Sequence, residues 1–237
     1  MEALAPWIED VDVRVAGEPL VVLPPDPATT LVWRITAAGE SGLLVAGPRT
    51  KAAYHAGKEL PVCVRLRIRP GRVTPLLAVG ADELVDRVVP LNELWGSEAD
   101  ALAEELLHLR DCPRRAVDLL GMRLLTKLPD RVPGRFDLVG AAVTDLAAAR
   151  SVGETAARLG VSDRYLRRVF QQAVGVSPKH FARIARVRLL LSGRDSWSNL
   201  AASGGYADQS HLIADFRSLM RVTPAAYASG RVPVTYC

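Results

Sequence analysis

An internal repeat near the C-terminal end limits the folds open to this chain more than any other feature does. The stretch TAARLGVSDRYLRRVFQQAVGVSPKHF, from Thr155, aligns without gaps with AASGGYADQSHLIADFRSLMRVTPAAY, from Ala201, at an offset of 46 residues. The shared positions are apolar, small or typical of helix starts. They pair Ala156 with Ala202, Leu166 with Leu212, Phe170 with Phe216, Val176 with Val222, Ser177 with Thr223, Pro178 with Pro224 and Phe181 with Tyr227. Both copies are therefore predicted to share one fold.

Each copy has the pattern of a short helix, a tight turn and a second helix. In the first copy, Ser151 and Glu154 have the spacing of a capping box, which predicts a helix over 151–159. Gly160 suits the turn and Ser162 can cap the next helix. The buried stripe of that helix is predicted at Leu166, Val169 and Phe170. This spacing is typical of a helix-turn-helix, whose second helix enters the DNA major groove.

A longer helix is predicted between the two copies. Ser177 and Thr223 can each cap a helix whose first residue is a proline. The helix from Pro178 is expected to reach about Leu191 and to pack on both copies. Its apolar positions are Phe181, Ile184, Leu189 and Leu190. A rigid connector would let one chain read two successive major grooves, about 34 Å apart. The alternative is a helical bundle for protein contacts.

The charge distribution separates these alternatives. The whole chain has a net charge of +4. Residues 134–237 contain 14 basic and 7 acidic residues. Residues 1–96 contain 10 basic and 12 acidic residues, and residues 97–133 contain 6 basic and 7 acidic residues. Between Arg158 and Arg194, nine basic residues accompany one acidic residue, Asp163. This asymmetry favours a polyanionic partner such as nucleic acid.

Residues from about 137 to 230 resemble the DNA-binding domain of the AraC/XylS family of transcription regulators. The resemblance rests on the repeat, the GVSP and VTP ends and the segment GGYADQSHL. It implies base reading by Arg164, Arg167 and Arg168 in the first copy and by Gln209, Ser210, Ile213 and Ala214 in the second. Arginine suits this role because it can donate two hydrogen bonds to guanine. The full set of predicted DNA-binding residues is Ser162, Asp163, Arg164, Arg167, Arg168, Lys179, Gln209, Ser210, His211 and Ile213.

The second copy departs from the family pattern. Ala214 and Ile213 cannot donate a hydrogen bond to a base. Arg221 also stands where the first copy has Gly175, the glycine that usually ends this helix. We therefore expect an asymmetric reader, whose second copy binds mainly to phosphates through Gln209, Ser210 and the helix N-terminus.

The N-terminal part changes to an alternating, strand-like pattern. Strands are predicted over 11–15, 20–23, 31–35, 43–47 and 62–69, and helical segments over 74–78 and 81–87. A small β-barrel or sandwich is the expected architecture, which makes the chain α+β. In the last strand, Arg65 and Arg67 lie opposite the apolar face, so they face either solvent or a cavity for an anionic effector. Trp33, Arg65 and Arg67 are the candidate effector-binding residues.

Between the halves, Ser97–Asp111 and Pro113–Pro129 are predicted to form an amphipathic helical hairpin. Its leucine stripes would serve either domain packing or dimerisation, and family members favour dimerisation. The expected division is a β-rich sensor or partner domain over 1–96, the hairpin and linker over 97–133, with the linker near 128–135, and the reader over 134–237.

The sequence gives little support for an enzyme, a cofactor or a metal. His55 is the one histidine before His108, and it is expected at the surface. Cys63, Cys112 and Cys237 form no cluster. No apolar run could span a bilayer and no signal peptide is apparent, so a cytoplasmic location without membrane contact is expected.

The main hypothesis is a bacterial transcription regulator that binds double-stranded DNA. RNA polymerase, a small-molecule or protein effector and a second copy are its expected partners. An activator is expected, although no residue separates activation from repression. The alternatives are an interaction protein with a degenerate second helix-turn-helix and a DNA-modifying protein that uses this domain for targeting.

Overall fold

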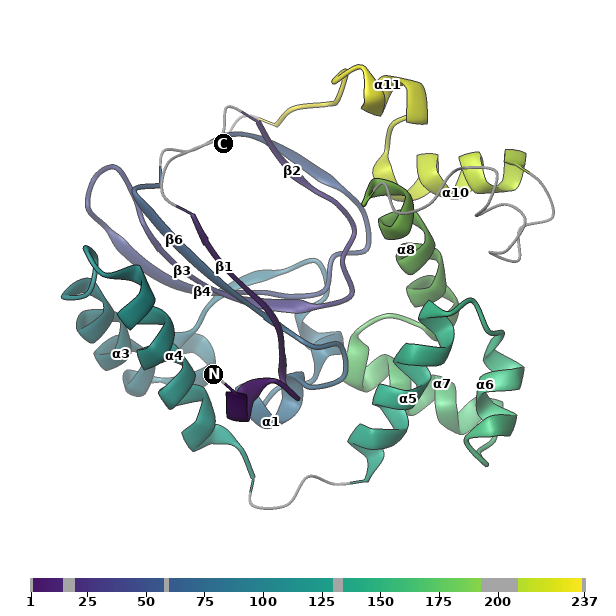
Figure 1. The fold of residues 1–237 in the computed structure, drawn as a ribbon, viewed down its shortest axis with the longest axis horizontal. Coiled ribbons are helices and arrows are strands. Elements are labelled where there is room, and N and C mark those ends of the chain that lie inside the picture. The colour runs from purple at the N-terminus through teal and green to yellow at the C-terminus, as the bar shows by residue number, and fades with distance from the viewer. Residues whose placement is uncertain (1, 15–19, 58–59, 130–133, 193–208, 236–237) are drawn as a thin grey trace.

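A computed structural model describes residues 2–14, 20–57, 60–129, 134–192 and 209–235. A β-rich N-terminal region is followed by a helical C-terminal region, which confirms the predicted α+β class (Figure 1). None of the described helices is both long and apolar enough to cross a bilayer.

The described strands form two antiparallel sheets. The larger sheet has the order β1 (Ile8–Arg14), β6 (Val62–Ile68), β3 (Thr29–Ile35), β4 (Ser41–Ala46) and β7 (Val88–Pro90). The smaller sheet pairs β2 (Leu20–Leu23) with β5 (Ala53–Ala56). All five predicted strands are present, with ends shifted by up to three residues. The short strands β5 and β7 were not predicted.

Strand β6 shows how the larger sheet separates two environments. Val62, Val64, Leu66 and Ile68 are buried in the main hydrophobic core, as the alternation predicts. The residues between them, Arg65 and Arg67 among them, lie on the opposite face. Short helical segments border the sheet: η1 (Glu2–Leu4), α1 (Val73–Leu77), η2 (Ala81–Leu84) and α2 (Asn92–Trp95). Both α1 and η2 lie where the sequence predicts helical segments.

The helical hairpin consists of α3 (Ser97–Leu107) and α4 (Pro113–Lys127). Its predicted leucine stripe packs on the sheet of its own chain, because Leu102, Leu106, Leu120 and Leu124 are buried in the same core as the strands. These leucines therefore form an intramolecular interface, and the expectation that they serve dimerisation is corrected. The domain boundaries at 96 and 133 stay predictions.

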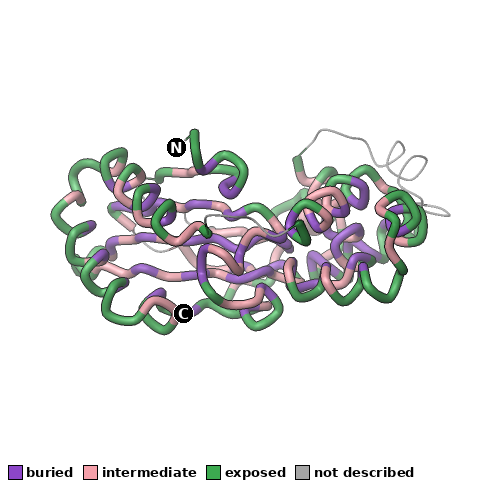
Figure 2. Tube along the Cα trace, turned by 90° about the horizontal axis from the view of Figure 1, so that it is seen from below, coloured by how far each residue is buried: buried purple, intermediate pink, exposed green. Residues whose placement is uncertain are grey.

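The described part of the C-terminal region contains α5 (Arg135–Ala147), α6 (Val152–Arg158), α7 (Asp163–Val174), α8 (Pro178–Leu191), α10 (Gln209–Met220) and α11 (Pro224–Ala228). Figure 2 shows buried segments in both the sheet region and the helical region. One core, made mainly of α5, α6 and α7, includes Phe181 of α8. A second core joins Ala52 and Tyr54 of the N-terminal region to α8 and α10.

The two regions also approach closely at two glycines. A Cβ atom on Gly175, just after α7, would lie 2.8 Å from the backbone oxygen of Ala81 in η2. A Cβ atom on Gly71 would lie 2.5 Å from a side-chain carbon of Val139 in α5. The β-rich region is therefore packed directly against the helices that form the predicted reader.

Candidate nucleic-acid interface and effector cavity

The first helix-turn-helix unit, α6 and α7, has the local structure that its sequence predicts. Ser151 accepts from the Glu154 backbone N–H at 3.2 Å, and Glu154 accepts from the Ser151 backbone N–H at 2.9 Å. Gly160 turns the chain with a φ of +67°. The Ser162 hydroxyl then accepts from the Tyr165 backbone N–H at 3.2 Å and caps α7.

The three predicted base-reading arginines of α7 are exposed. They lie away from Leu166 and Phe170, which are fully buried, while Val169 is half-buried. Arg167 forms an ion pair with Asp163 at 3.6 Å, one turn earlier on the same helix. The Arg168 guanidinium lies 5.6 Å from the ring centre of Tyr165. These groups present positive charge and hydrogen-bond donors on the outer face of α7.

The sequence repeat is also visible in the packing of the described residues. Phe170 meets Phe181 edge-on, with 5.4 Å between ring centres and 79° between planes. At the repeated positions, Phe216 meets Tyr227 at 5.9 Å and 74°. The hydroxyl groups of Ser177 and Thr223 both cap the next helix, as predicted. The described part of the second copy, from α10 onward, therefore has the same packing and cap as the matching part of the first copy.

Helix α8 connects the units and has the predicted ends. Phe181 packs in the core of the first unit, whereas Ile184 and Val187 pack in the core that contains α10. Arg183 of α8 also forms a 2.8 Å ion pair with Asp215 of α10. The prediction for Leu189 was wrong: it is 36% exposed, and Val187 takes the buried position. Lys179, on the first turn, is exposed, as a phosphate contact requires.

In the second unit, only the second helix, α10, is described, because residues 193–208 lie outside the described part. Ser210, His211, Ile213 and Ala214 are exposed, while Leu212 and Phe216 are buried. The side chain of Gln209 lies outside the description. Arg221 follows α10 with a φ of +60°, the left-handed conformation that Gly175 has after α7 at +86°. A non-glycine residue is unfavourable in this conformation.

Arginines gather on the polar face of the larger sheet, in three neighbouring hollows. A cleft of about 710 Å³ between the sheet and α5 and α8 is lined by Arg67, Arg69, Arg72 and Arg188, with Glu9 as its one acidic residue among those described. Arg65 lines two smaller cavities of about 260 and 240 Å³, together with Arg49. Arg67 and Arg188 line both the cleft and the larger of these cavities.

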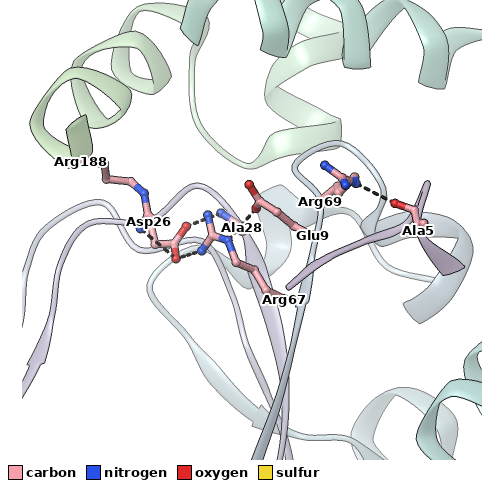
Figure 3. A network of polar contacts seen from close by, with 7 residues as sticks. All are labelled: Ala5, Glu9, Asp26, Ala28, Arg67, Arg69 and Arg188. Atoms are coloured by element: carbon pink, nitrogen blue, oxygen red, sulfur yellow. Dashed lines mark hydrogen bonds and ion pairs between the residues drawn. The ribbon is translucent and has the colours of Figure 1, made fainter. Parts of the chain in front are cut away.

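A network of ion pairs joins this face to the connecting helix (Figure 3). Asp26 pairs with Arg67 and, at 3.2 Å, with Arg188 of α8. Arg67 also pairs with Glu9 at 2.6 Å. Arg69 donates to the backbone oxygen of Ala5 at 2.9 Å. One carboxylate is therefore shared by two partly buried guanidinium groups.

The burial of these cations has an electrostatic cost. Burial, followed by the charges of Arg65 and Arg188, lowers the pKa of Arg49 to about 10. Burial also lowers the pKa values of Arg67 and Arg188. An anion placed among these groups would relieve the repulsion and favour their charged forms. The arrangement can therefore hold an anionic group.

The candidate effector residues lie on two faces of the sheet. Arg65 and Arg67 line the cavities. Of the two options that the sequence left open for them, solvent or a cavity, the structure therefore shows the cavity. Trp33 is fully buried on the opposite face, where its indole N–H donates to the Ser41 hydroxyl at 3.1 Å. The prediction that Trp33 binds an effector together with Arg65 and Arg67 is therefore corrected. The alternation along β3 turns the Trp33 side chain into the main core.

Sequence reasoning missed Arg49, Arg188 and Asp26. Arg188 was counted only among the basic residues of the reader, and Asp26 and Arg49 lie in loops beside prolines. No local pattern brings such residues together. His55 was expected at the surface but is half-buried on β5. Burial raises the pKa of the Cys63 thiol, which disfavours the reactive thiolate.

The capped helices, the exposed arginines and the repeated packing define a helix-turn-helix DNA-binding protein. Residues 155–230 match a family model described as "Helix-turn-helix domain". Residues 155–230 therefore form a helix-turn-helix domain of the AraC type, and this domain supports a role in DNA binding and transcription regulation.

Solved structures give similarities at low sequence identity. Apo ToxT from Vibrio cholerae, in a form with one substituted residue, is 14% identical, with 94% of this chain and 97% of that chain covered and a TM-score of 0.43. ToxT from the same species, bound to (E)-4-(8-methylnaphthalen-1-yl)but-3-enoic acid, is 11% identical, with 94% and 100% covered and a TM-score of 0.46. The C-terminal domain of AraT from Geobacillus stearothermophilus is 24% identical, with 44% and 91% covered and a TM-score of 0.36. A search of curated protein sequences found no match.

Proposed function

We propose that this regulator reads two successive major grooves with unequal units and that an anion bound among its sheet arginines controls it. The exposed row of Arg164, Arg167 and Arg168 on a capped helix is the observation that supports the reading role of the first unit. A guanidinium can bind guanine O6 and N7 together, so the first unit supplies most of the base preference.

The second unit contributes mainly affinity in this proposal. Ser210 is exposed at the start of α10, where it can contact phosphates together with Gln209 and the helix N-terminus. Ile213 is 38% exposed and offers an apolar contact to a thymine methyl. Lys179, at the start of α8, adds a phosphate contact between the two units.

The effector site in this proposal is the arginine-lined face that contains Arg65 and Arg67. Its support is the excess of guanidinium groups over carboxylates in all three hollows. Arg188 belongs to α8, the helix that spaces the two units, and it borders two of these hollows. An anion there would compete with Asp26 for Arg188. Because Arg188 lies on α8, effector binding could in this way change the position of the helix that connects the two units.

The cellular role follows from DNA binding. The protein would work in the bacterial cytoplasm beside the chromosome, with RNA polymerase as a further partner. A second copy would meet it through a surface other than the buried leucine stripes of the hairpin. Met122 and Leu125 are exposed on α4 and would be available for such a contact.

DNA binding is tested by titrating the full-length protein with footprinted fragments of its genomic DNA at rising salt. Affinity should fall steeply with salt, and Lys179→Ala should reduce the slope of log K against log salt by about 1. Arg110→Ala, at an exposed position just after α3, is the matched control because it also removes one positive charge. A flat salt response, with genomic and random duplexes bound alike, would instead favour an interaction protein with a degenerate reader.

The effector proposal is tested on the same protein with citrate and inorganic phosphate as anionic probes. Either anion should raise the thermal midpoint of the wild type more than that of Arg65→Gln, because the variant removes one cation from the cavity. Equal shifts in wild type and variant would rule out a site at Arg65.

A further inference from the structure

The C-terminal end of α10 is held by hydrogen bonds from the N-terminal region. The last carbonyls of a helix have no partner within the helix and need donors from elsewhere. The Leu219 carbonyl accepts from the Ala52 backbone N–H at 2.8 Å. The Met220 carbonyl accepts from the Tyr54 hydroxyl at 2.6 Å. Both donors belong to β5 or to the residue just before it, far away in the sequence.

These hydrogen bonds are protected from water. Ala52 and Tyr54 are each 2% exposed and share a core with Phe216, Leu219 and Met220. Burial raises the pKa of Tyr54 to about 12, so its hydroxyl keeps the proton that it donates. A buried carbonyl that loses its donor is costly, so removal of either donor should destabilise this helix end.

The two units differ in how their second helices end. After α7, Gly175 adopts the left-handed conformation without a side-chain penalty, and its N–H donates to Gln171 O at 2.7 Å. After α10, Arg221 makes the corresponding bond to Arg217 O at 2.9 Å, but in a conformation that disfavours a Cβ atom. The helix with the poorer cap of its own is the one that receives two donors from the N-terminal region.

Strand β5 also holds the segment that follows α11. The Thr235 backbone N–H donates to Tyr54 O at 2.8 Å, and the Ala56 N–H donates to Thr235 O at 3.1 Å. Thr235 lies parallel to His55 in this bridge. The opposite edge of β5 pairs with β2. One short strand therefore contacts the second unit both at the end of α10 and beyond α11.

We propose that Ala52–Ala56 is a capping strand that positions the second recognition helix on DNA, with Tyr54 as the main positioning residue. This proposal depends on one part of the proposed function, namely that the second unit contacts DNA. It explains why the second unit tolerates an arginine in place of the capping glycine: its cap is supplied by the other region of the chain. The first unit has its own glycine cap and does not depend on Tyr54.

The test compares full-length wild type with Tyr54→Phe, which removes only the hydroxyl. Two duplexes are used: a footprinted genomic fragment, and the same fragment with the segment protected by the second unit scrambled. The variant should bind the intact fragment about three- to tenfold more weakly. It should bind the scrambled fragment as the wild type does. Amide hydrogen exchange should become faster at residues 219–222 and stay unchanged in α7.

Two further variants separate positioning from general destabilisation. Tyr54→Phe combined with Arg221→Gly should regain wild-type affinity, because glycine restores a favourable cap at the same helix end. Tyr227→Phe is the matched control, since the structure records no hydrogen bond of that hydroxyl within the described residues, and it should bind both fragments normally.

The outcomes are distinguishable. Equal affinity of the wild type for the intact and scrambled fragments would show that the second unit does not contact DNA, so the proposed function would fail. A wild type that distinguishes the fragments, together with unchanged binding by Tyr54→Phe, would overturn the capping proposal alone. Equal loss on both fragments, or no rescue by Arg221→Gly, would also overturn it.

Discussion

Arg167 and Asp163 lie one turn apart on the exposed face of α7, and their interaction with each other is weak. Both side chains are 52% exposed and the charged atoms are 3.6 Å apart. Such exposed pairs contribute little to stability. The Arg167 guanidinium can therefore leave Asp163 for a base at little cost. The proposed reading face of the first unit is therefore exposed and positively charged, and its helix is fixed by the buried side chains of Leu166 and Phe170.

Replacement of Arg167 by alanine tests this face. Arg167→Ala should cost about 1 to 3 kcal/mol of binding and relax the preference at one base position. Gln209→Ala, in the second unit, should weaken all sequences alike because phosphate contacts are independent of sequence. The measurement is a titration against a set of operators with single base changes. The reverse ranking would contradict the proposed asymmetry of the two units.

His180, on the first turn of α8, gives a prediction on pH. Its Nε2 atom is buried without a hydrogen-bond partner in the described residues. Burial, with Arg183 as the next cause, lowers the pKa of the folded-state imidazole below 6.5. The unfolded chain then binds a proton more readily than the folded chain does. His180 therefore contributes stability above about pH 6.5, and this is lost as pH falls through the lowered folded pKa.

Denaturant titrations between pH 7.5 and 5 check this sign. The unfolding free energy of the wild type should decrease toward low pH, and His180→Gln should show a smaller decrease. His108→Gln, at an exposed position at the end of α3, is the control and should retain the wild-type slope. Identical slopes for the wild type and His180→Gln would contradict the prediction.

Among the helices and strands, the helix ends could be predicted from the sequence far better than the sheet edges. The four helix caps could be predicted because each capping hydroxyl lies within four residues of the backbone N–H that it accepts from. These caps are Ser151, Ser162, Ser177 and Thr223. The strands β5 and β7 are short, and only their partners across the sheet define them. Arg221 was recognised as unusual, but the donors that compensate for it come from β5 and leave no local pattern.

Gly175 tests how tightly the first unit is joined to the N-terminal region. An alanine there would need a left-handed backbone, and its Cβ would lie 2.8 Å from Ala81 O. Gly175→Ala should destabilise the full-length protein by more than about 1 kcal/mol. Gly160→Ala, also at positive φ but with open space around it, should show the conformational cost alone. Equal losses in denaturant titrations would show that the contact with Ala81 does not matter.

The β-rich region and the proposed reader are joined by groups that sequence reasoning could not bring together. The candidate effector arginines on β6 were predicted from alternation alone. Their partners Asp26 and Arg188 come from a loop and from the connecting helix, and only the folded chain places them on one network. The same contact makes α8 a structural neighbour of the cavities, so the helix that connects the two units borders the proposed anion-binding face.

Removal of the shared carboxylate tests this link. Asp26→Asn leaves Arg67 and Arg188 without their common charge partner, and we expect a loss of about 2 to 3 kcal/mol in unfolding free energy. Glu105→Gln, which breaks the exposed pair with Arg123 on the helical hairpin, should cost less than about 1 kcal/mol. In a double-mutant cycle, Arg188→Gln should cost less in the Asp26→Asn background than in the wild type, because the ion pair is already broken.

Added anions should partly compensate for the missing carboxylate. Inorganic phosphate should raise the thermal midpoint of Asp26→Asn more than that of the wild type or of Glu105→Gln, since it can bind beside the guanidinium groups of Arg67 and Arg188 that have lost the Asp26 carboxylate. Sodium chloride at the same ionic strength separates specific binding from screening, because chloride screens charge without offering several acceptor oxygens. Additive losses in the cycle, with equal phosphate effects in all three proteins, would mean that Asp26 does not couple the β-rich region to α8. In that case an effector bound at the sheet would have to reach the reader through the packed contacts of Gly71 and Gly175 instead.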